Sequence, residues 1–264
     1  MKSKPIKSIV IIGSGNVATS LAINLFRNKY SIRQIYSATL EHAEELAIKV
    51  NASYTNIPQE IDCSADLYII ATPDNIIEEI LESIIFSVSI IVHTSGATSI
   101  NVFLNKNIDN YGVLYPLQTF SKSKPINDFK NVPVFLEANK PDVLKVLYEL
   151  AVNLSDSVYE VNSEQRLALH VSGVFACNFV NHLLALSVDI MTAYKLDKQW
   201  LTPLINETIE KAISVNQPGE VQTGPAIRND KLTLQRHTDF LKDNPNWLEI
   251  YKLLSDSIMN YKEK

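Results

Sequence analysis

The segment that most constrains the fold of this 264-residue chain lies near its N-terminus, where an apolar run ends in a glycine-rich turn. Residues 6–12 are mostly β-branched, and residues 13–18 read Gly-Ser-Gly-Asn-Val-Ala before a helical pattern begins. This order is typical of a strand, a tight turn and a helix N-terminus that together bind a pyrophosphate. The pattern therefore predicts a dinucleotide site, although the same order also suits a plain strand–turn–helix corner.

The small residues of this turn each have a physical role. Gly13 permits a sharp turn, Gly15 lets the backbone approach the phosphates, and Ala18 lets the helix pack closely on the strand. The N–H groups and the positive dipole end of the helix then face the anion. The residues expected to hold the pyrophosphate are Gly13, Ser14, Gly15, Asn16, Val17 and Ala18.

Composition indicates an ordinary globular protein without electrostatic attraction to nucleic acid. The chain is 46% hydrophobic and 20% charged, with a formal net charge of -5. Its two cysteines, Cys63 and Cys177, lie far apart in sequence and indicate no disulfide framework, which fits a reducing cytoplasm. Because no hydrophobic leader precedes the first apolar run, we expect no signal peptide and a cytoplasmic protein.

Residues 167–188 contain no Asp, Glu, Lys or Arg, and a helix of that length can span a bilayer. Seven polar or small residues interrupt the segment, so a lipid-facing helix is unfavourable. We expect no membrane partner and a helix that is buried between protein layers. The seven residues are His170, Ser172, Gly173, Asn178, Asn181, His182 and Ser187.

Strand-like and helix-like segments alternate over the first 161 residues. Strands are expected at 31–37, 66–72 and 89–94, with helices at 41–50 and 75–84. This alternation predicts an α/β fold, a doubly wound Rossmann-type parallel sheet with helices on both faces.

The pattern changes to helices alone after residue 161. Asn162 and Gln165 predict a capping box at the start of a long helix. The chain is therefore expected to divide into an NAD(P)-binding domain, residues 1–161, and an all-helical domain, residues 162–264.

Later motifs resemble those of a known family. Residues 92–96 read Val-His-Thr-Ser-Gly, 115–121 read Tyr-Pro-Leu-Gln-Thr-Phe-Ser, 170–182 run from His through Asn178 to His, and 223–228 read Thr-Gly-Pro-Ala-Ile-Arg. Over essentially the whole chain these motifs resemble Rossmann-like proteins with a C-terminal DUF2520 domain. The glycine turn resembles that of F420-dependent NADP oxidoreductases and pyrroline-5-carboxylate reductases. The resemblance implies an NADP oxidoreductase whose helical domain forms a homodimer.

The end of the second predicted strand bears on cofactor choice. NAD sites usually place Asp or Glu there to bind the ribose 2′-hydroxyl, whereas residues 36–39 read Tyr-Ser-Ala-Thr. A carboxylate would repel a 2′-phosphate, so its absence favours NADP, to which Ser37 and Thr39 can donate hydrogen bonds. Ala38 stands where an arginine would bind the phosphate better, so NAD stays possible. Alternatively, Ser37 and Thr39 only cap the next helix.

Three predicted strand ends carry further candidates, because ligands bind at the carboxyl ends of parallel strands. Thr72 and Pro73 are expected beside the cofactor's ribose and nicotinamide. His93 can act as an acid or base, or can be a packing histidine with one satisfied hydrogen bond. At the third strand end, Tyr115, Gln118 and Thr119 are expected to contact substrate, and Tyr115 can also donate a proton. The alternative is a surface turn that is set by Pro116.

The long helix carries polar residues at spacings of four. His170, Asn178 and His182 lie on one slowly drifting face with Val174. Related β-hydroxyacid-type dehydrogenases have a catalytic lysine four residues before the asparagine, where this chain has Val174. The resemblance therefore implies another proton donor, for which His170 is our candidate, with Asn178 and His182 contacting substrate. The alternative is a satisfied network at a helix interface.

No metal site is expected, and one arginine is a candidate anion ligand. His170 and His182 lie three turns apart, roughly 18 Å along a helix, so they cannot share an ion. Arg228 follows a Gly-Pro turn and can clamp a substrate carboxylate or phosphate, or pair with an acid such as Asp230.

Taken together, the sequence predicts an NADP-dependent oxidoreductase that moves a hydride to or from a small polar carbonyl or imine between its two domains. The rival interpretation is a non-catalytic nucleotide-sensing or scaffold protein, favoured by the missing lysine. An F420-dependent enzyme is supported by fold analogy alone.

Overall fold

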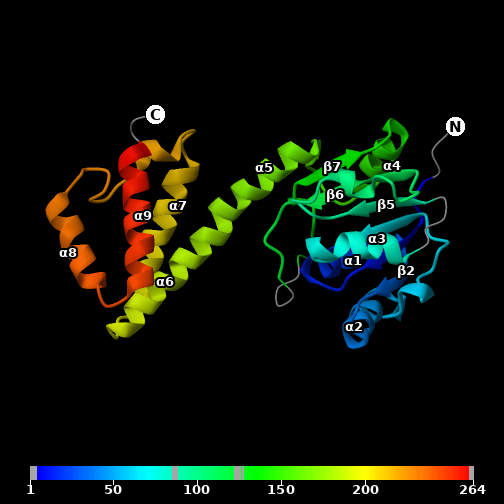
Figure 1. Ribbon diagram of the computed structural model, residues 1–264, viewed down its shortest axis with the longest axis horizontal. Helices are drawn as coiled ribbons and strands as arrows, with labels where there is room; N and C mark the ends of the chain where they lie inside the picture. Colours follow the sequence, from blue (N-terminus) through cyan, green and yellow to red (C-terminus); the bar gives the residue numbers. More distant parts are fainter. Residues whose placement is uncertain (1–4, 85–88, 122–125, 127, 262–264) are drawn as a thin grey trace. The chain divides into compact units, whose positions relative to one another are not determined.

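The computed structural model describes residues 5–84, 89–121, 126 and 128–261. The chain forms two compact units, Met1–Asn178 and Phe179–Lys264, and each is described by itself (Figure 1). The sequence placed a domain boundary after residue 161, whereas this division falls within the long helix that follows. Strand structure nevertheless ends where the sequence predicts, because the last strand in the described part of the chain stops at Glu160.

The first unit contains an eight-stranded sheet in the order β3-β2-β1-β4-β5-β6-β7-β8 (Figure 1). All neighbouring strands are parallel except β6 and β7, which are antiparallel. The predicted doubly wound Rossmann-type fold is confirmed, with an antiparallel step that was not predicted. The strands are β1 (Ser8–Ile12), β2 (Ser31–Tyr36), β3 (Ser53–Thr55), β4 (Leu67–Ile70), β5 (Ile90–His93), β6 (Asn110–Pro116), β7 (Val134–Ala138) and β8 (Val158–Glu160).

Alternation along the strands sends side chains to two separate cores. Ile9 and Ile11 of β1 pack in one cluster, and Val10 and Ile12 pack in the other. Both faces are covered, so the strands read as continuous apolar runs. Helices α1 (Asn16–Arg27), α2 (Leu40–Val50) and α4 (Pro141–Ala151) cover the first face, and α3 (Ile77–Ser83) covers the second. Short 3-10 helices join them: η1 (Pro58–Glu60), η2 (Asp74–Ile76) and η3 (Ile100–Phe103).

In the sheet, β1 lies between β2 and β4, and the strand order reverses there. The glycine turn directly follows β1. Gly13 has φ +121°, and an added Cβ would collide with the carbonyl of Ala71 after β4. The position therefore requires glycine both for its backbone conformation and for space. Ala18 is fully buried beneath the turn, as its predicted packing role requires.

One continuous helical run, Ser163–Ala193, crosses from the first unit into the second. It consists of α5 (Ser163–Gly173), a π-helical stretch η4 (Val174–Phe179) and α6 (Val180–Ala193). The predicted capping box is present, because the Asn162 side chain accepts from the Gln165 N–H and the Gln165 side chain accepts from the Asn162 N–H.

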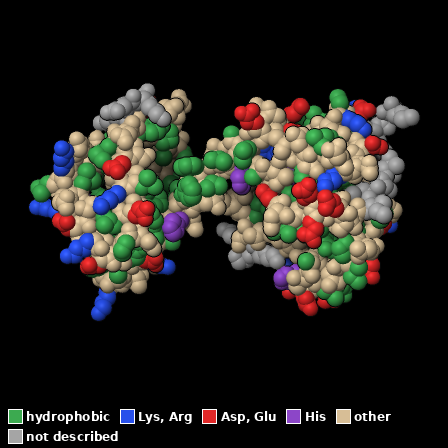
Figure 2. All heavy atoms as spheres, in the orientation of Figure 1, with side chains coloured by type: hydrophobic (Ala, Val, Ile, Leu, Met, Phe, Trp, Pro, Cys, Tyr) green, Lys and Arg blue, Asp and Glu red, His purple; other side chains and the backbone are tan. Residues whose placement is uncertain are grey.

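This helical run is long and apolar enough to cross a membrane, with a mean hydropathy of 1.5 over its most apolar stretch. None of that stretch is buried in the single chain, and its burial between protein layers stays a prediction. Figure 2 shows hydrophobic side chains at the surface along it. Leu167, Val171 and Leu183 are among its exposed large apolar residues.

The second unit is all helical, and it buries very little. Ala226 and Leu241 are the buried apolar residues among those of this unit that the structure describes. Besides α6 it contains η5 (Lys198–Leu201), α7 (Thr202–Ile213), η6 (Pro218–Val221), α8 (Lys231–Leu241) and α9 (Pro245–Tyr261).

Candidate functional site

A cavity of about 820 Å³ opens in the first unit at the carboxyl ends of the parallel strands. Its walls come from the glycine turn, from the residues that follow β4, β5 and β6, and from the long helix between Leu169 and Asn178. This is the place where open α/β sheets bind ligands. The predicted residues that line it are Gly15, Asn16, Val17, Thr72, Pro73, Tyr115, Gln118, Thr119, His170 and Asn178.

Other predicted residues do not line this cavity. Gly13 and Ala18 support the turn from beneath, and Ser14 and Ser37 are engaged with each other. His182 and Arg228 belong to the second unit, where Arg228 lines a separate cavity of about 780 Å³ that includes Glu220 and Tyr261. The full set outside the main cavity is Gly13, Ser14, Ala18, Ser37, Thr39, His93, His182 and Arg228.

The N-terminus of α1 borders the cavity and has no side-chain cap. Gly15 is the N-cap residue, so no side chain caps the helix, and the first turn contains no acid. A Cβ on Gly15 would meet no described atom within 4 Å, which leaves open space above the turn. The unshared N–H groups of a helix start favour a bound anion. Within the same cavity the Thr72 hydroxyl is buried and has no hydrogen-bond partner among the described residues, as a ligand-binding group would be before its ligand arrives.

The hydroxyl groups of Ser37 and Thr39, which were predicted to contact a 2′-phosphate or to cap α2, lie in different surroundings after β2. The Ser37 hydroxyl lies 2.8 Å from the Ser14 hydroxyl, and both residues are buried. Thr39 is the exposed N-cap of α2, but its side chain makes no capping hydrogen bond. The alternative that these two hydroxyls serve to cap the helix is therefore wrong, while their predicted contact with a 2′-phosphate stays a prediction.

Tyr115 and His170 meet inside the cavity. The Tyr115 Oη lies 3.1 Å from His170 Nδ1, and the rings are arranged edge to face. Tyr115 is buried and His170 half-buried. Burial raises the pKa of the Tyr115 phenol, the charge of Arg166 lowers it, and the Asp74 carboxylate raises it, with a net upward shift.

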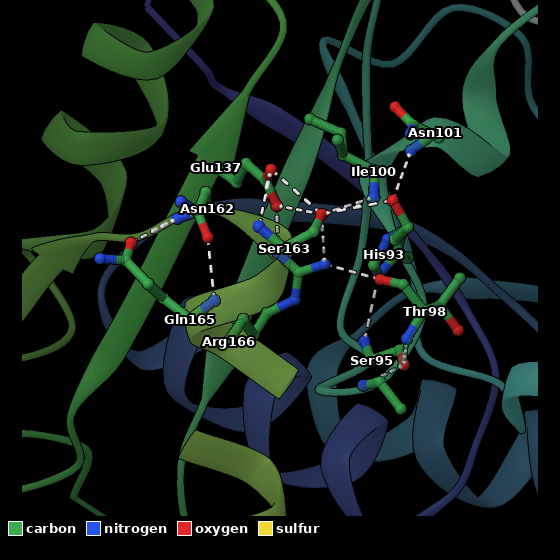
Figure 3. Close-up of polar contacts among 12 residues, drawn as sticks. His93, Ser95, Thr98, Ile100, Asn101, Glu137, Asn162, Ser163, Gln165 and Arg166 are labelled. Carbon is green, nitrogen blue, oxygen red and sulfur yellow. Dashed lines mark hydrogen bonds and ion pairs between the residues drawn. The ribbon is translucent and has the colours of Figure 1, made fainter. Parts of the chain in front are cut away.

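A buried polar network fixes the first turn of α5 to the sheet (Figure 3). Arg166 donates to the Glu137 carboxylate of β7 and, at 2.6 Å, to the Thr98 carbonyl beyond β5. Ser163 donates to Glu137 through its N–H and its hydroxyl, and accepts from the Ile100 N–H. Sequence reasoning missed Arg166 and Glu137. A signal existed, because Arg166 is the last charged residue before the uncharged segment 167–188.

His93 lies outside the cavity wall and is fully buried. Its ring stacks on Phe103, and Nδ1 accepts a hydrogen bond of 3.2 Å from the Ser95 N–H. Burial, and after it the charge of Arg166, lowers the pKa of His93 to about 3. A neutral ring at this depth fits the packing interpretation: His93 holds the loop after β5, and a proton-donor role does not fit its placement.

The π-helical stretch Val174–Phe179 contributes part of the cavity wall. His170, Val174 and Asn178 all line it, as their spacing predicts, and Ala176 and Cys177 line it as well. A π-helix is wider than an α-helix and frequently marks a functional site. A Cβ at Gly173 would lie 3.5 Å from the Leu117 side chain, which is an ordinary van der Waals contact, so no described neighbour requires a glycine there.

Comparison with known proteins agrees with this architecture. The model of the DUF2520 domain, a domain of unknown function, matches residues 132–258, and the model described as NADP oxidoreductase, coenzyme F420-dependent, matches residues 8–95. None of the curated proteins compared with the chain matches it.

Several solved structures are similar to this chain. The structure of a "putative NADP oxidoreductase" from Bacteroides fragilis is 41% identical, with a TM-score of 0.90, and the match covers 97% of this chain and 98% of that one. An imine reductase from Myxococcus stipitatus in complex with NADP+ is 12% identical (TM-score 0.62; 96% and 92% covered). A pyrroline-5-carboxylate reductase from Coxiella burnetii is 14% identical (TM-score 0.55; 97% and 99% covered). The last two share the fold, whereas the first shares sequence over its whole length, and the chain therefore belongs to the family of Rossmann-type NADP oxidoreductase-like proteins with a C-terminal DUF2520 domain.

Proposed function

We propose that this chain is a cytoplasmic, NADP-dependent oxidoreductase that moves a hydride to or from a small polar carbonyl or imine compound. The observation that carries the proposal is the 820 Å³ cavity, in which an uncapped helix N-terminus and a group of polar side chains line one space. A dinucleotide held at the glycine turn would share that space with Tyr115 and His170. The fold likeness to a reductase of imines solved with NADP+ supports this class of reaction.

The residues present fit a nicotinamide dinucleotide. The turn from Gly13 to Ala18 would hold the pyrophosphate over the open space at Gly15. Thr72 and Pro73, at the cavity wall, would contact the ribose and the nicotinamide, which gives the buried Thr72 hydroxyl a partner. When bound, the reduced cofactor supplies the hydride.

The 2′-phosphate preference follows from charge. Residues 36–40 contain no carboxylate, so the segment after β2 lacks the acid with which NAD sites usually bind the ribose 2′-hydroxyl. Thr39 is exposed at the N-terminus of α2, where the helix dipole favours an anion, and Ser37 lies behind it. We therefore propose NADP ahead of NAD, with NAD as the weaker ligand.

The polar groups of the cavity can perform the proton chemistry. His170 is the acid/base candidate, since it is half-buried, lines the cavity and has ring nitrogens that can donate or accept a proton. Asn178, Gln118 and Thr119 offer amide and hydroxyl groups that would orient a polar substrate. The proposal does not depend on His182 or Arg228.

We also propose that the helical unit pairs with a second copy of the chain. A unit of this size needs a sizeable apolar core, yet its described residues bury only Ala226 and Leu241 as apolar side chains. Leu204 and Leu253 are 63% and 69% exposed on α7 and α9. Such apolar area is typical of a surface covered by another subunit.

The proposed reaction is tested by following NADPH consumption with a panel of cyclic imines and small keto compounds. We expect NADPH-dependent reduction of at least one of these compounds by the wild-type chain and none by Gly15→Asp, whose carboxylate would repel the pyrophosphate. If NADPH binds but no compound raises its oxidation above background, the nucleotide-sensing or scaffold alternative replaces the enzyme.

A further inference from the structure

We propose that Tyr115 is the group that hands the proton to the substrate, and that His170 resupplies Tyr115 through Nδ1. This inference rests on the proposed oxidoreductase function and assigns the two residues separate roles. Tyr115 is then the catalytic acid, and His170 is a positioning and proton-supplying residue that acts through it. The starting point is the 3.1 Å contact between Tyr115 Oη and His170 Nδ1 at the cavity wall.

The phenol of Tyr115 is more deeply buried than the imidazole of His170. Tyr115 is 8% exposed, and its ring packs against Phe135, with the ring centroids 6.4 Å apart. It stands at the carboxyl end of β6 beside β5, among the strand ends that line the cavity. A proton donor must keep a fixed position relative to the reacting atom, which favours a side chain on a strand end over one on the exposed helix.

The surroundings of the phenol suit proton donation. Burial and the Asp74 carboxylate keep Tyr115 protonated near neutral pH, so it meets a substrate as an acid. The Arg166 charge favours the anion that remains after donation. Arg166 is four residues before His170 on α5 and is fixed by Glu137, so this charge keeps its place.

Gly96 makes the pairing sterically possible. A Cβ at this position would lie 2.7 Å from His170 Nδ1 and 2.8 Å from Tyr115 Cζ, closer than van der Waals contact allows. The backbone of Gly96 lies in a region open to any residue, so the requirement for glycine is one of space and not of conformation. The loop after β5 is therefore shaped around the Tyr115–His170 pair.

The proposed step combines hydride addition with proton transfer from Tyr115. The hydride adds to the carbon of the C=N or C=O group, and the π electron pair moves to nitrogen or oxygen. That atom takes the Tyr115 hydroxyl proton, and the phenolate takes the Nδ1 proton of His170 while Nε2 of the same ring takes a proton from water in the cavity. The net change is one hydride from the cofactor and one proton from solvent, with His170 left as its other neutral tautomer.

This mechanism requires His170 to carry its proton on Nδ1 in the resting protein, so that Tyr115 is free to donate. Nitrogen-15 NMR of the histidine-labelled full-length protein measures this directly, with the His170 signals assigned from the His170→Asn variant. We expect a neutral ring protonated at Nδ1, whose Nδ1 signal shifts in Tyr115→Phe and not in Tyr159→Phe. Tyr159 is a matched control, because its ring stacks on Phe135 but is 52% exposed and outside the cavity. A ring protonated at Nε2 alone would overturn the proposed proton supply.

The second test measures kcat for the compound that is identified in the NADPH panel. Tyr115→Phe is expected to lower kcat by roughly 10²–10⁴-fold, as loss of a general acid does, with unchanged affinity for NADPH. His170→Asn keeps a hydrogen-bond donor near Oη but cannot relay protons, so its kcat should fall and recover on addition of free imidazole. A purely structural role for His170 would not give that recovery.

The outcomes separate the two proposals. If the wild-type chain turns over a substrate and Tyr115→Phe does so equally well, the assignment of Tyr115 is overturned while the oxidoreductase function stands. If the wild-type chain turns over none of the compounds, the proposed function is lost and this assignment with it.

Discussion

Arg166 on α5 and Glu137 on β7 form an ion pair in which the Arg166 side chain is 1% exposed. The long helix is therefore tied to the sheet by a buried charge, four residues before the histidine that lines the cavity. Removing Arg166 leaves the Glu137 carboxylate, whose side chain is 14% exposed, without its counter-charge, and breaking a buried ion pair typically costs about 3–5 kcal/mol. We predict that Arg166→Met lowers the free energy of unfolding by this amount in urea denaturation.

A surface ion pair provides the control for this prediction. Lys211 and Glu207 lie 2.8 Å apart, with side chains 57% and 56% exposed. Exposed i,i+4 pairs contribute only about 0.3–0.5 kcal/mol, so Lys211→Met should change stability by no more than that. Equal losses in the two variants would show that the Arg166 pair is not the anchor of α5.

His93 predicts a dependence of stability on pH. Its pKa is about 3 in the folded chain and 6.5 when unperturbed, so the unfolded chain binds the proton more tightly. The contribution of the neutral His93 ring to the free energy of unfolding is fully present above about pH 6.5 and is lost as the pH falls toward 3. Between pH 8 and pH 5 we expect a loss of about 2 kcal/mol from this group, since one pKa unit is about 1.4 kcal/mol.

The variant His93→Asn isolates this effect. Asparagine can accept the Ser95 N–H as Nδ1 does, but it has no proton to take up. Unfolding free energies measured at both pH values should fall less steeply for the variant than for the wild-type chain. Parallel pH profiles would mean that His93 is not the buried neutral group described above.

The end of β2 predicts how cofactor preference can be changed. Ala38 is exposed beside Thr39, and an arginine there can bind a 2′-phosphate with two hydrogen bonds. Ala38→Arg should tighten NADPH roughly 10-fold, about 1.4 kcal/mol, and leave NADH nearly unchanged. Ile48→Arg adds the same charge at a site 74% exposed on α2 and serves as the control. An equal gain in both variants would indicate general charge attraction instead of a 2′-phosphate site.

The proposed pairing of helical units predicts that the protein is a dimer and that charged substitutions at the paired surface lower its mass in solution to that of a monomer. The wild-type chain should sediment as a dimer, and the double variant Leu204→Glu, Leu253→Glu should sediment as a monomer, because two buried carboxylates per subunit oppose association. Ile48→Glu, on an apolar exposed position of the first unit, should remain dimeric. A monomeric wild-type chain would rule out the second copy as the partner of this surface.

Local patterns in the sequence predicted the parts of this molecule that depend on neighbouring residues. The Gly13 turn and the Asn162–Gln165 capping box each rest on residues a few positions apart, and both are present. The candidate cavity was predicted in part because strand ends of a parallel sheet meet at one edge, which brings Thr72, Tyr115 and the glycine turn together.

The rest depended on contacts between distant residues. Glu137 and Arg166 are 29 residues apart, and no local periodicity links them. His93 ends its strand as predicted, but packing against Phe103 directs it away from the cavity. The π-helical stretch at Val174–Phe179 has no sequence signal that distinguishes it from an α-helix.

The central claim is that the glycine turn binds a nicotinamide dinucleotide, and calorimetric titration with NADPH, NADH and their oxidised forms tests it most directly. The wild-type chain should bind the NADP pair with micromolar affinity, Gly15→Ala should bind more weakly but fold normally because its Cβ meets open space, and Gly15→Asp should not bind. Absence of binding by the wild-type chain, or equal binding by Gly15→Asp, would contradict the account.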